Sequence, residues 1–200
     1  MKARTASCSR KTRETDIRVE IDLDRPGKIS VATGVGFFDH LLEAAAFHGC
    51  FSLTVQARGD LEVDSHHLVE DTGLVIGEAL RQAAEGGQEF NRFGHALIPM
   101  DDALSEVTVD AGGRPYLVFE SLFPQERSGN FEMILVREFL IALANRARIT
   151  LHAELRHGKN SHHCAESLFK ALGRALRQAY SPLAAGAGLP QGMSTKGTLS

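Results

Sequence analysis

Hydrophobic and polar residues alternate strictly near the start of the chain. Between residues 17 and 23, Ile, Val, Ile and Leu are separated from one another by charged residues. A period of two is typical of a strand with one buried face, so this pattern predicts a strand. The turn Arg25-Pro-Gly27 then leads to a second short strand over 28–33.

The pattern changes to a helical one in the next segment. Apolar residues recur at helical intervals over 37–47, and Gly49 is a typical helix-terminating residue. A further strand is predicted over 51–57 and a longer helix over 65–84, which ends before Gly86-Gly87. The predicted order is therefore strand, strand, helix, strand, helix.

The chain contains an internal repeat. Asp64-Ser-His-His-Leu-Val-Glu70 recurs 96 residues later as Asn160-Ser-His-His-Cys-Ala-Glu166. His40 and Glu138 occupy equivalent places, each 13 residues before a leucine of the following strand. The repeat predicts the same order of elements in the second half, with strands at 103–111, 115–121 and 149–156 and helices at 131–146 and 161–180.

These elements predict an α+β fold, a tandem duplication of a β-β-α-β-α half with two sheets packed with helices on one side. We expect the first half to span 1–93 and the second to span 94–186. The tail from Ser181 is rich in Gly, Ala and Ser, and we expect residues 187–200 to form a flexible C-terminal tail that closes on substrate.

Composition limits the possible functions. With 200 residues, 43% of them hydrophobic, the chain has enough apolar material for a buried core. A net charge of -3 argues against nucleic-acid and membrane-surface partners. No apolar run approaches the roughly 18 residues of a membrane span, and the first residues are too charged for a signal peptide. Three cysteines without a CxxC pair fit a reducing compartment, so we expect a cytoplasmic protein.

The repeated histidines indicate a metal site. Adjacent residues on a helix diverge by about 100°, so His66 and His67 cannot both face one ion, whereas Glu70 can join either. Each copy therefore predicts ligands for two different ions, each completed by the other half or by another subunit. Imidazole with carboxylate suits Mn, Fe or Zn better than Ca or Mg. The predicted ligands, four per ion, are His40, His66, His67, Glu70, Glu138, His162, His163 and Glu166.

Several motifs together resemble imidazoleglycerol-phosphate dehydratase, an enzyme family of histidine biosynthesis. The resemblance extends from about residue 13 to residue 196 and is carried by TGVGFFDH at 33–40, DSHHLVEDTG at 64–73, NRFG at 91–94, GGRPY at 112–116, TLH at 150–152 and GKNSHHCAESLFKALGRAL at 158–176. It implies a hydro-lyase that removes water from D-erythro-imidazole glycerol phosphate to give imidazole acetol phosphate. It also implies two Mn2+ ions per active site and a homo-oligomer of 24 subunits with sites between subunits.

The resemblance also implies roles for individual residues. Seven of the predicted ligands match the family, but Glu138 stands where the better-known version has His. A carboxylate is a sound manganese ligand, so we keep Glu138 as a ligand, with a helix-surface ion pair as the alternative. Glu14 is the leading candidate for acid/base catalysis. The expected catalytic residues are Glu14 together with all the predicted ligands except Glu138. The residues expected to contact substrate are Glu14, His40, His48, Arg92, Arg114, Lys170, Ser194 and Lys196. Of these, the resemblance implies that Arg92, Arg114, Lys170, Ser194 and Lys196 contact the substrate's phosphate.

Some assignments stay open at this point. His48 lies two helical turns after His40, which suits either packing or substrate contact. Asp39, Asp71 and Asp101 are candidates for fixing the tautomers of ligating imidazoles. Two other functions would fit a pair of metal ions: hydrolysis of phosphate esters, and metal storage or sensing without catalysis. Storage gives no role to the predicted phosphate-binding residues.

Overall fold

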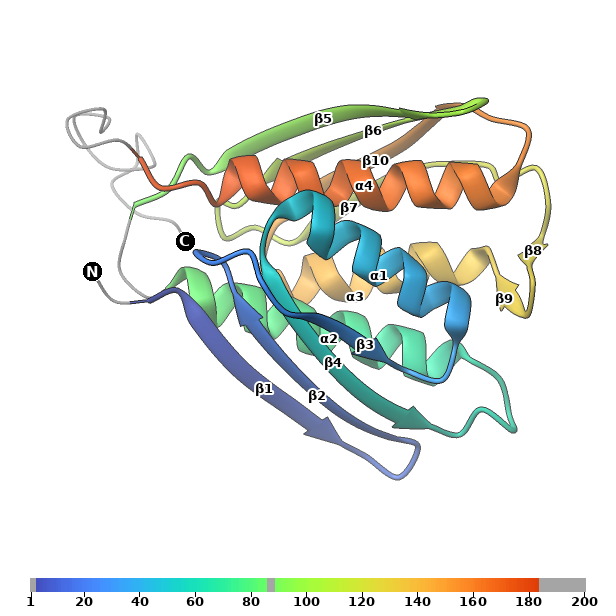
Figure 1. The fold of residues 1–200 in the computed structure, drawn as a ribbon, viewed down its shortest axis with the longest axis horizontal. Coiled ribbons are helices and arrows are strands. Elements are labelled where there is room, and N and C mark those ends of the chain that lie inside the picture. Colours follow the sequence, from blue (N-terminus) through green and yellow to red (C-terminus); the bar gives the residue numbers. More distant parts are fainter. Residues whose placement is uncertain (1–2, 86–88, 184–200) are drawn as a thin grey trace.

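Each half of the chain folds into a four-stranded sheet and two helices (Figure 1). The computed structural model describes residues 3–85 and 89–183. The first half contains β1 (Thr5–Lys11), β2 (Thr15–Asp22), β3 (Ile29–Ala32), α1 (Gly36–Gly49), β4 (Ser52–Gly59) and α2 (His66–Ala84). The second contains β5 (Phe93–Met100), β6 (Ala103–Asp110), β7 (Tyr116–Glu120), α3 (Ile134–Ala147), β10 (Thr150–His157) and α4 (Ser161–Ala179). A small hairpin of β8 (Arg127–Ser128) and β9 (Phe131–Glu132) precedes α3.

The α+β class and the duplication are confirmed, but each of the two large sheets has one strand more than the sequence pattern predicts, and the β8–β9 hairpin was not predicted. The additional strands, β1 and β5, are the first of each half and lie at a sheet edge. In β1 the only buried residue is Cys8, so this strand carries no apolar alternation that could reveal it. The pattern also placed the start of a helix at 131, where β9 lies, and α3 begins at Ile134. The proposed division at residue 93 stays a prediction.

The two sheets have the same topology. Their strand orders are β1-β2-β4-β3 and β5-β6-β10-β7, with β4 and β10 each antiparallel to one neighbour and parallel to the other. Ile21 lies opposite Leu53 in the first sheet, and Val109 lies opposite Leu151 in the second. The register therefore preserves the spacing of the sequence repeat.

The four helices lie between the two sheets, so each sheet has its helices on one side, as predicted (Figure 1). Helix α2 packs on α3, and α1 packs on α4. Phe38, Phe139 and Phe169 are fully buried in this helical layer. The ring of Phe139 contacts that of Phe38 on one side and that of Phe169 on the other. Among the described helices, none combines the length and apolar composition needed to cross a membrane.

Matching glycines permit the two helix pairs to approach closely. A Cβ added at Gly77 in α2 would lie 2.7 Å from Leu143 O and 2.9 Å from Ala147 N of α3. Gly173 in α4 has the same relation to Ala45 O and Gly49 N of α1. These positions correspond in the repeat, so an equivalent glycine lies at the close approach of each helix pair.

Candidate metal centre and active site

The two copies of the histidine motif lie in the first turns of α2 and α4, which begin at the same end of the molecule (Figure 1). Each helix start is fixed by a side chain from the motif itself. Asp64 accepts a hydrogen bond from the backbone N–H of His66, and Asn160 accepts one from that of His162. These contacts satisfy N–H groups that have no partner within the helix.

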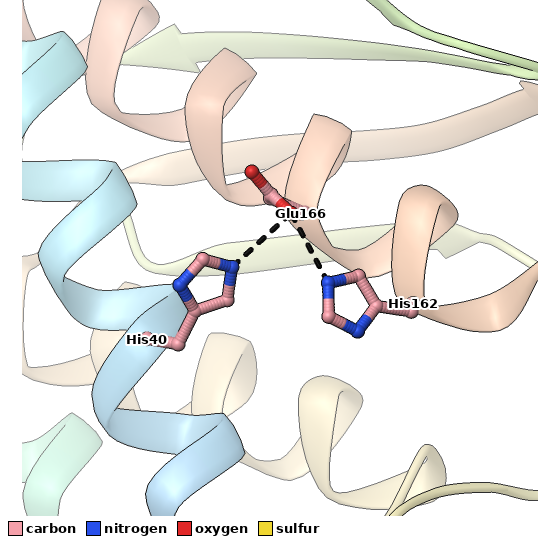
Figure 2. A group of neighbouring side chains, drawn as sticks. All are labelled: His40, His162 and Glu166. Carbon is pink, nitrogen blue, oxygen red and sulfur yellow. Dashed lines mark ion pairs between the residues drawn. The ribbon is translucent and has the colours of Figure 1, made fainter.

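His40, His162 and Glu166 form one cluster at this end. Figure 2 shows both imidazoles directed at the Glu166 carboxylate, with His40 on α1 and the other two on α4. Oε2 of Glu166 lies 3.1 Å from Nε2 of His40 and 3.3 Å from Nε2 of His162. One atom from each residue lies within 4.8 Å of the others, which is close enough for all three to hold one ion.

The electrostatics of this cluster suit a divalent cation. Burial raises the pKa of Glu166, but the hydrogen bond from Lys170 and the nearby imidazole of His40 outweigh it and bring the pKa to about 2. Glu166 is therefore charged at neutral pH. Nε2 of His40 is buried and, within the described part of the chain, has no partner in hydrogen-bond geometry. A charged carboxylate beside an unsatisfied imidazole nitrogen is a donor set that fits Mn, Fe or Zn.

The first-half counterpart is more open. His66 Nε2 lies 3.7 Å from Glu70 Oε2, and Glu138 Oε1 lies 3.2 Å from Nη1 of Arg137. Within residues 3–85 and 89–183, only the His40 group forms a cluster of three potential ligands. Glu138 therefore forms the helix-surface ion pair that was the alternative to a ligand role. The role of Glu138 as a metal ligand stays a prediction.

The second histidine of each motif bonds to a carboxylate through Nδ1. His67 Nδ1 lies 3.0 Å from Asp60 Oδ2, and this hydrogen bond raises the pKa of His67. His163 Nδ1 lies 2.6 Å from Asp102 Oδ1. That bond, together with the backbone N–H of Lys159, lowers the pKa of Asp102 to about 2. Because Nδ1 is engaged in both rings, Nε2 is the nitrogen left for a metal ion.

The candidates Asp39 and Asp71 for this orienting role were wrong. Asp39 accepts hydrogen bonds from the backbone and hydroxyl of Thr33, and Asp71 accepts one from Arg10. Neither contacts an imidazole within the described residues, because each turns toward a neighbouring strand or loop. Asp101 is 74% exposed and lies 3.6 Å from His163 Nε2, so it is near the ring but does not hold Nδ1.

Sequence reasoning missed Asp60 and Asp102, although a signal was present. Asp60 directly follows β4, and Asp102 directly precedes β6. The end of β4 lies beside the start of α2, and the start of β6 lies beside the start of α4. A carboxylate at the end of a predicted strand, next to a predicted helix start, could have been used to find them.

Glu14 lies at the same end of the molecule, in the turn between β1 and β2. Its Oε2 is 3.9 Å from Nδ1 of His67, and its side chain is 55% exposed. His48 is half-buried on α1. Burial, followed by the charge of Lys170, lowers the pKa of His48. The substrate contacts predicted for these two residues stay predictions.

The predicted phosphate-binding residues are separated within one chain. Lys170 Nζ lies 2.8 Å from Glu166 Oε1, beside the histidine cluster. Arg92 and Arg114 instead share Asp110, at 2.6 Å and 3.2 Å. Asp110 is the last residue of β6, and Asp102, which holds His163, precedes the first. At about 3.3 Å per residue, the two aspartates are roughly 25 Å apart. Ser194 and Lys196 lie outside the described residues.

Comparison with known proteins identifies the family. A family model described as imidazoleglycerol-phosphate dehydratase matches residues 33–176. The chain is 54% identical over 176 residues to the imidazoleglycerol-phosphate dehydratase of Streptococcus sanguinis, covering 88% of this chain and 91% of that protein. The chain belongs to the imidazoleglycerol-phosphate dehydratase family. It is also 50% identical to the dehydratase of Clostridium acetobutylicum over 196 residues, 98% of each chain.

Crystal structures of imidazoleglycerol-phosphate dehydratases have the same fold. The Staphylococcus aureus enzyme superimposes with a TM-score of 0.82 at 38% identity, covering 90% of this chain and 99% of that one. The Pyrococcus furiosus enzyme gives 0.81 at 39% identity, covering 95% and 99%. This dehydratase is therefore a hydro-lyase of histidine biosynthesis, and its metal-binding character is consistent with the His40 cluster.

Proposed function

We propose that this dehydratase removes water from D-erythro-imidazole glycerol phosphate to give imidazole acetol phosphate, using two Mn2+ ions per active site in the cytoplasm. The observation that carries the proposal is the cluster of His40, His162 and Glu166 in a chain of this family. Within residues 3–85 and 89–183, the buried imidazole nitrogen of His40 has no hydrogen-bond partner. The mixture of imidazole and charged carboxylate favours a cation such as Mn2+.

The residues proposed to hold the ions are those of the two motifs and the two helices packed against them. When bound, the two ions supply Lewis-acid stabilisation of charge on the substrate's imidazole ring and fix its orientation. His67 and His163 each engage Nδ1 with a carboxylate and leave Nε2 for a metal. The full set is His40, His66, His67, Glu70, Glu138, His162, His163 and Glu166.

Proton movement is assigned to Glu14. The substrate loses its C3 hydroxyl and its C2 hydrogen, and the enol that results becomes the ketone. Hydroxide is a poor leaving group and no carbonyl acidifies C2, so a side chain must deliver one proton and accept the other. Glu14 is a half-exposed carboxylate 3.9 Å from His67, beside a proposed ligand and open to substrate.

The separation of the basic residues supports sites that are shared between subunits. Arg92 and Arg114 lie roughly 25 Å along β6 from Asp102, which holds His163. A three-carbon chain between ring and phosphate cannot span that distance. We therefore propose that the arginines of one subunit bind the phosphate of a substrate held by another, within an assembly of 24 subunits. His48, Lys170 and the tail residues Ser194 and Lys196 complete the proposed substrate contacts.

The test is to incubate the manganese-loaded protein with imidazole glycerol phosphate and to measure ketone and inorganic phosphate together. We expect ketone without phosphate, and loss of activity on chelation. Release of phosphate instead would favour an ester hydrolase, and neither product would favour metal storage.

A Glu14→Gln variant tests the acid/base role. We expect it to bind Mn2+ and substrate normally but to lower kcat by roughly 10²- to 10⁴-fold, the usual contribution of a positioned acid/base group. The measurement is kcat and KM beside metal content. A normal kcat would remove Glu14 from the proton transfer.

Two variants at Glu138 test its role as a ligand. Glu138→Ala should lower the bound Mn2+ measured by elemental analysis, whereas Glu138→His should retain it because imidazole is also a ligand. Full metal content in the alanine variant would show that Glu138 only pairs with Arg137.

A further inference from the structure

The two halves use different carboxylates to orient the second histidine of their motif. His67 is held by Asp60, which directly follows β4. His163 is held by Asp102, which directly precedes β6. In the repeat, β4 corresponds to β10 and β2 corresponds to β6, so these two aspartates do not occupy equivalent positions.

Each half therefore has two positions from which a carboxylate can reach the histidine. The position before β2 holds Glu14, and its equivalent before β6 holds Asp102. The position after β4 holds Asp60, and its equivalent after β10 holds Gly158. The first half has a carboxylate at both positions, and the second half has one only.

Packing explains why the second half lacks the other carboxylate. A Cβ on Gly158 would lie 2.3 Å from Cys164 Sγ and 3.2 Å from Ala103 Cβ, so no side chain fits there. Asp102 must then orient His163. It also accepts hydrogen bonds from the backbone N–H groups of Lys159 and Asn160, so this carboxylate is fully engaged.

The first half leaves one carboxylate available. Asp60 takes Nδ1 of His67 at 3.0 Å, while Glu14 remains 3.9 Å away. Among the described residues, the Glu14 carboxylate accepts no hydrogen bond. The Asp60 backbone N–H donates to the Glu14 carbonyl oxygen at 3.1 Å, which keeps the two residues side by side.

We propose that Asp60 is a positioning residue that orients His67 and thereby keeps the Glu14 carboxylate free for proton transfer. Without Asp60, Glu14 would take over Nδ1 of His67, as Asp102 holds His163, and would no longer move protons. This inference rests on the proposed function, in which His67 binds a metal and Glu14 is the acid/base. It assigns the proton carrier to the first half because only that half has a carboxylate at both of the equivalent positions, before β2 and after β4.

A double-mutant cycle on metal binding tests this exchange of roles. Mn2+ affinity is measured by calorimetry on metal-free protein for the wild type, Asp60→Ala, Glu14→Ala and the double variant, because glutamine at position 14 would keep an oxygen that can accept from Nδ1. We expect Glu14→Ala to leave affinity unchanged and Asp60→Ala to weaken it only a few-fold, because Glu14 replaces the lost acceptor. The double variant should lose roughly 10- to 100-fold, as expected when an orienting partner is removed. Equal affinities for the double variant and Asp60→Ala would overturn the proposal.

Turnover provides an independent measurement. At saturating Mn2+, Asp60→Ala should lower kcat at least tenfold with little change in KM, because Glu14 is then bound to His67. Asp60→Asn keeps an acceptor oxygen for Nδ1 and should restore both kcat and metal affinity. The matched control is Asp16→Asn, which alters an exposed carboxylate of β2 paired with Lys11. This variant should change neither kcat nor metal affinity. An unchanged kcat in Asp60→Ala would overturn the proposal.

The proposed function fails in a different way. If the wild type produces no ketone, the assigned reaction is wrong, whereas the affinity cycle can still show the exchange at His67. If His67→Ala binds Mn2+ as tightly as the wild type, His67 is not a ligand and the positioning role of Asp60 falls with it.

Discussion

Buried charged side chains in this protein are paired, and Arg4 is the clearest example. Its residue is 2% exposed, and its Nε donates to Asp24 Oδ1 at 2.8 Å. A second guanidinium nitrogen donates to the carbonyl oxygen of Tyr180. Arg4 thereby joins the N-terminal end of the first half to the C-terminal end of α4. A buried guanidinium needs such partners, because removing one leaves an unpaired charge in the interior.

Replacement of Asp24 should therefore destabilise the protein. We expect Asp24→Asn to cost about 2–4 kcal/mol in the free energy of unfolding, because Arg4 loses its charged partner. The measurement is urea denaturation at neutral pH. The exposed pair of Lys11 and Asp16 provides the control, and Asp16→Asn should have little effect. Equal stability of the two variants would contradict this prediction.

The same ion pair gives a pH dependence. The hydrogen bond from Arg4 lowers the pKa of Asp24 in the folded protein. A carboxyl group with a lowered pKa contributes stability that is fully present above its unfolded pKa of about 3.9 and is lost as the pH falls through its folded pKa. The difference in stability between wild type and Asp24→Asn should thus be constant between pH 5 and 7 and shrink below about pH 4. A difference independent of pH down to pH 2 would contradict the assignment.

At the scale of elements, the site depends on the distance between two helices. His40 is on α1, and His162 and Glu166 are on α4. Gly173 lets these helices approach closely, because a Cβ there would lie 2.1 Å from Ala45 O and 2.9 Å from Gly49 N. Both neighbours are backbone atoms of a helix, so they cannot move separately from the helix. The glycine sets the spacing at which these three side chains meet.

Gly173→Ala should separate α1 from α4. Alanine has the better helix propensity by about 1 kcal/mol, but the overlap with backbone should outweigh this and destabilise the protein by roughly 3 kcal/mol or more. Thermal unfolding and Mn2+ affinity measure the two consequences, and both should decrease. Gly36→Ala, where no atom lies within 4 Å of the added Cβ, is the matched control. If Gly173→Ala had the same thermal stability and Mn2+ affinity as Gly36→Ala, the prediction would be contradicted.

At the scale of the whole molecule, the groups proposed to bind one small substrate lie at opposite ends of one chain. The helices that carry the histidine motifs begin at one end, whereas β5 begins and β6 ends at the other (Figure 1). Arg92 and Arg114 are at the latter end, held by Asp110. In an isolated chain, the candidate metal cluster and the proposed phosphate-binding pair are therefore too far apart for one substrate molecule.

Complementation between inactive variants tests this arrangement. Arg114→Ala and Glu166→Gln should each be nearly inactive alone. Unfolded together and reassembled in equal amounts, they should recover activity at about a quarter of the sites, because a site can take its arginine and its carboxylate from different chains. Activity assays and particle mass on the same sample measure this. No recovery in fully reassembled particles would contradict sites shared between subunits.

Much of the fold could be predicted from local patterns. The alternation over 17–23, the helical spacing over 37–47 and the recurring histidine motif depend on neighbours in the sequence, and the corresponding elements are present. The edge strand β1 could not be predicted, because only Cys8 of its residues is buried. A strand that presents little surface to the core has little apolar periodicity.

The sequence by itself determined the duplication, the types of ligand and the family, because these depend on residue identity and spacing. Only the tertiary structure decided which carboxylates face the imidazoles. Asp102 meets His163 across 61 residues, and Asp71 instead meets Arg10 across the same separation. Such contacts depend on strand register and on the space available, as at Gly158, where the sulfur of Cys164 excludes a side chain. Register and space are set by the packing of whole elements, which no local pattern records.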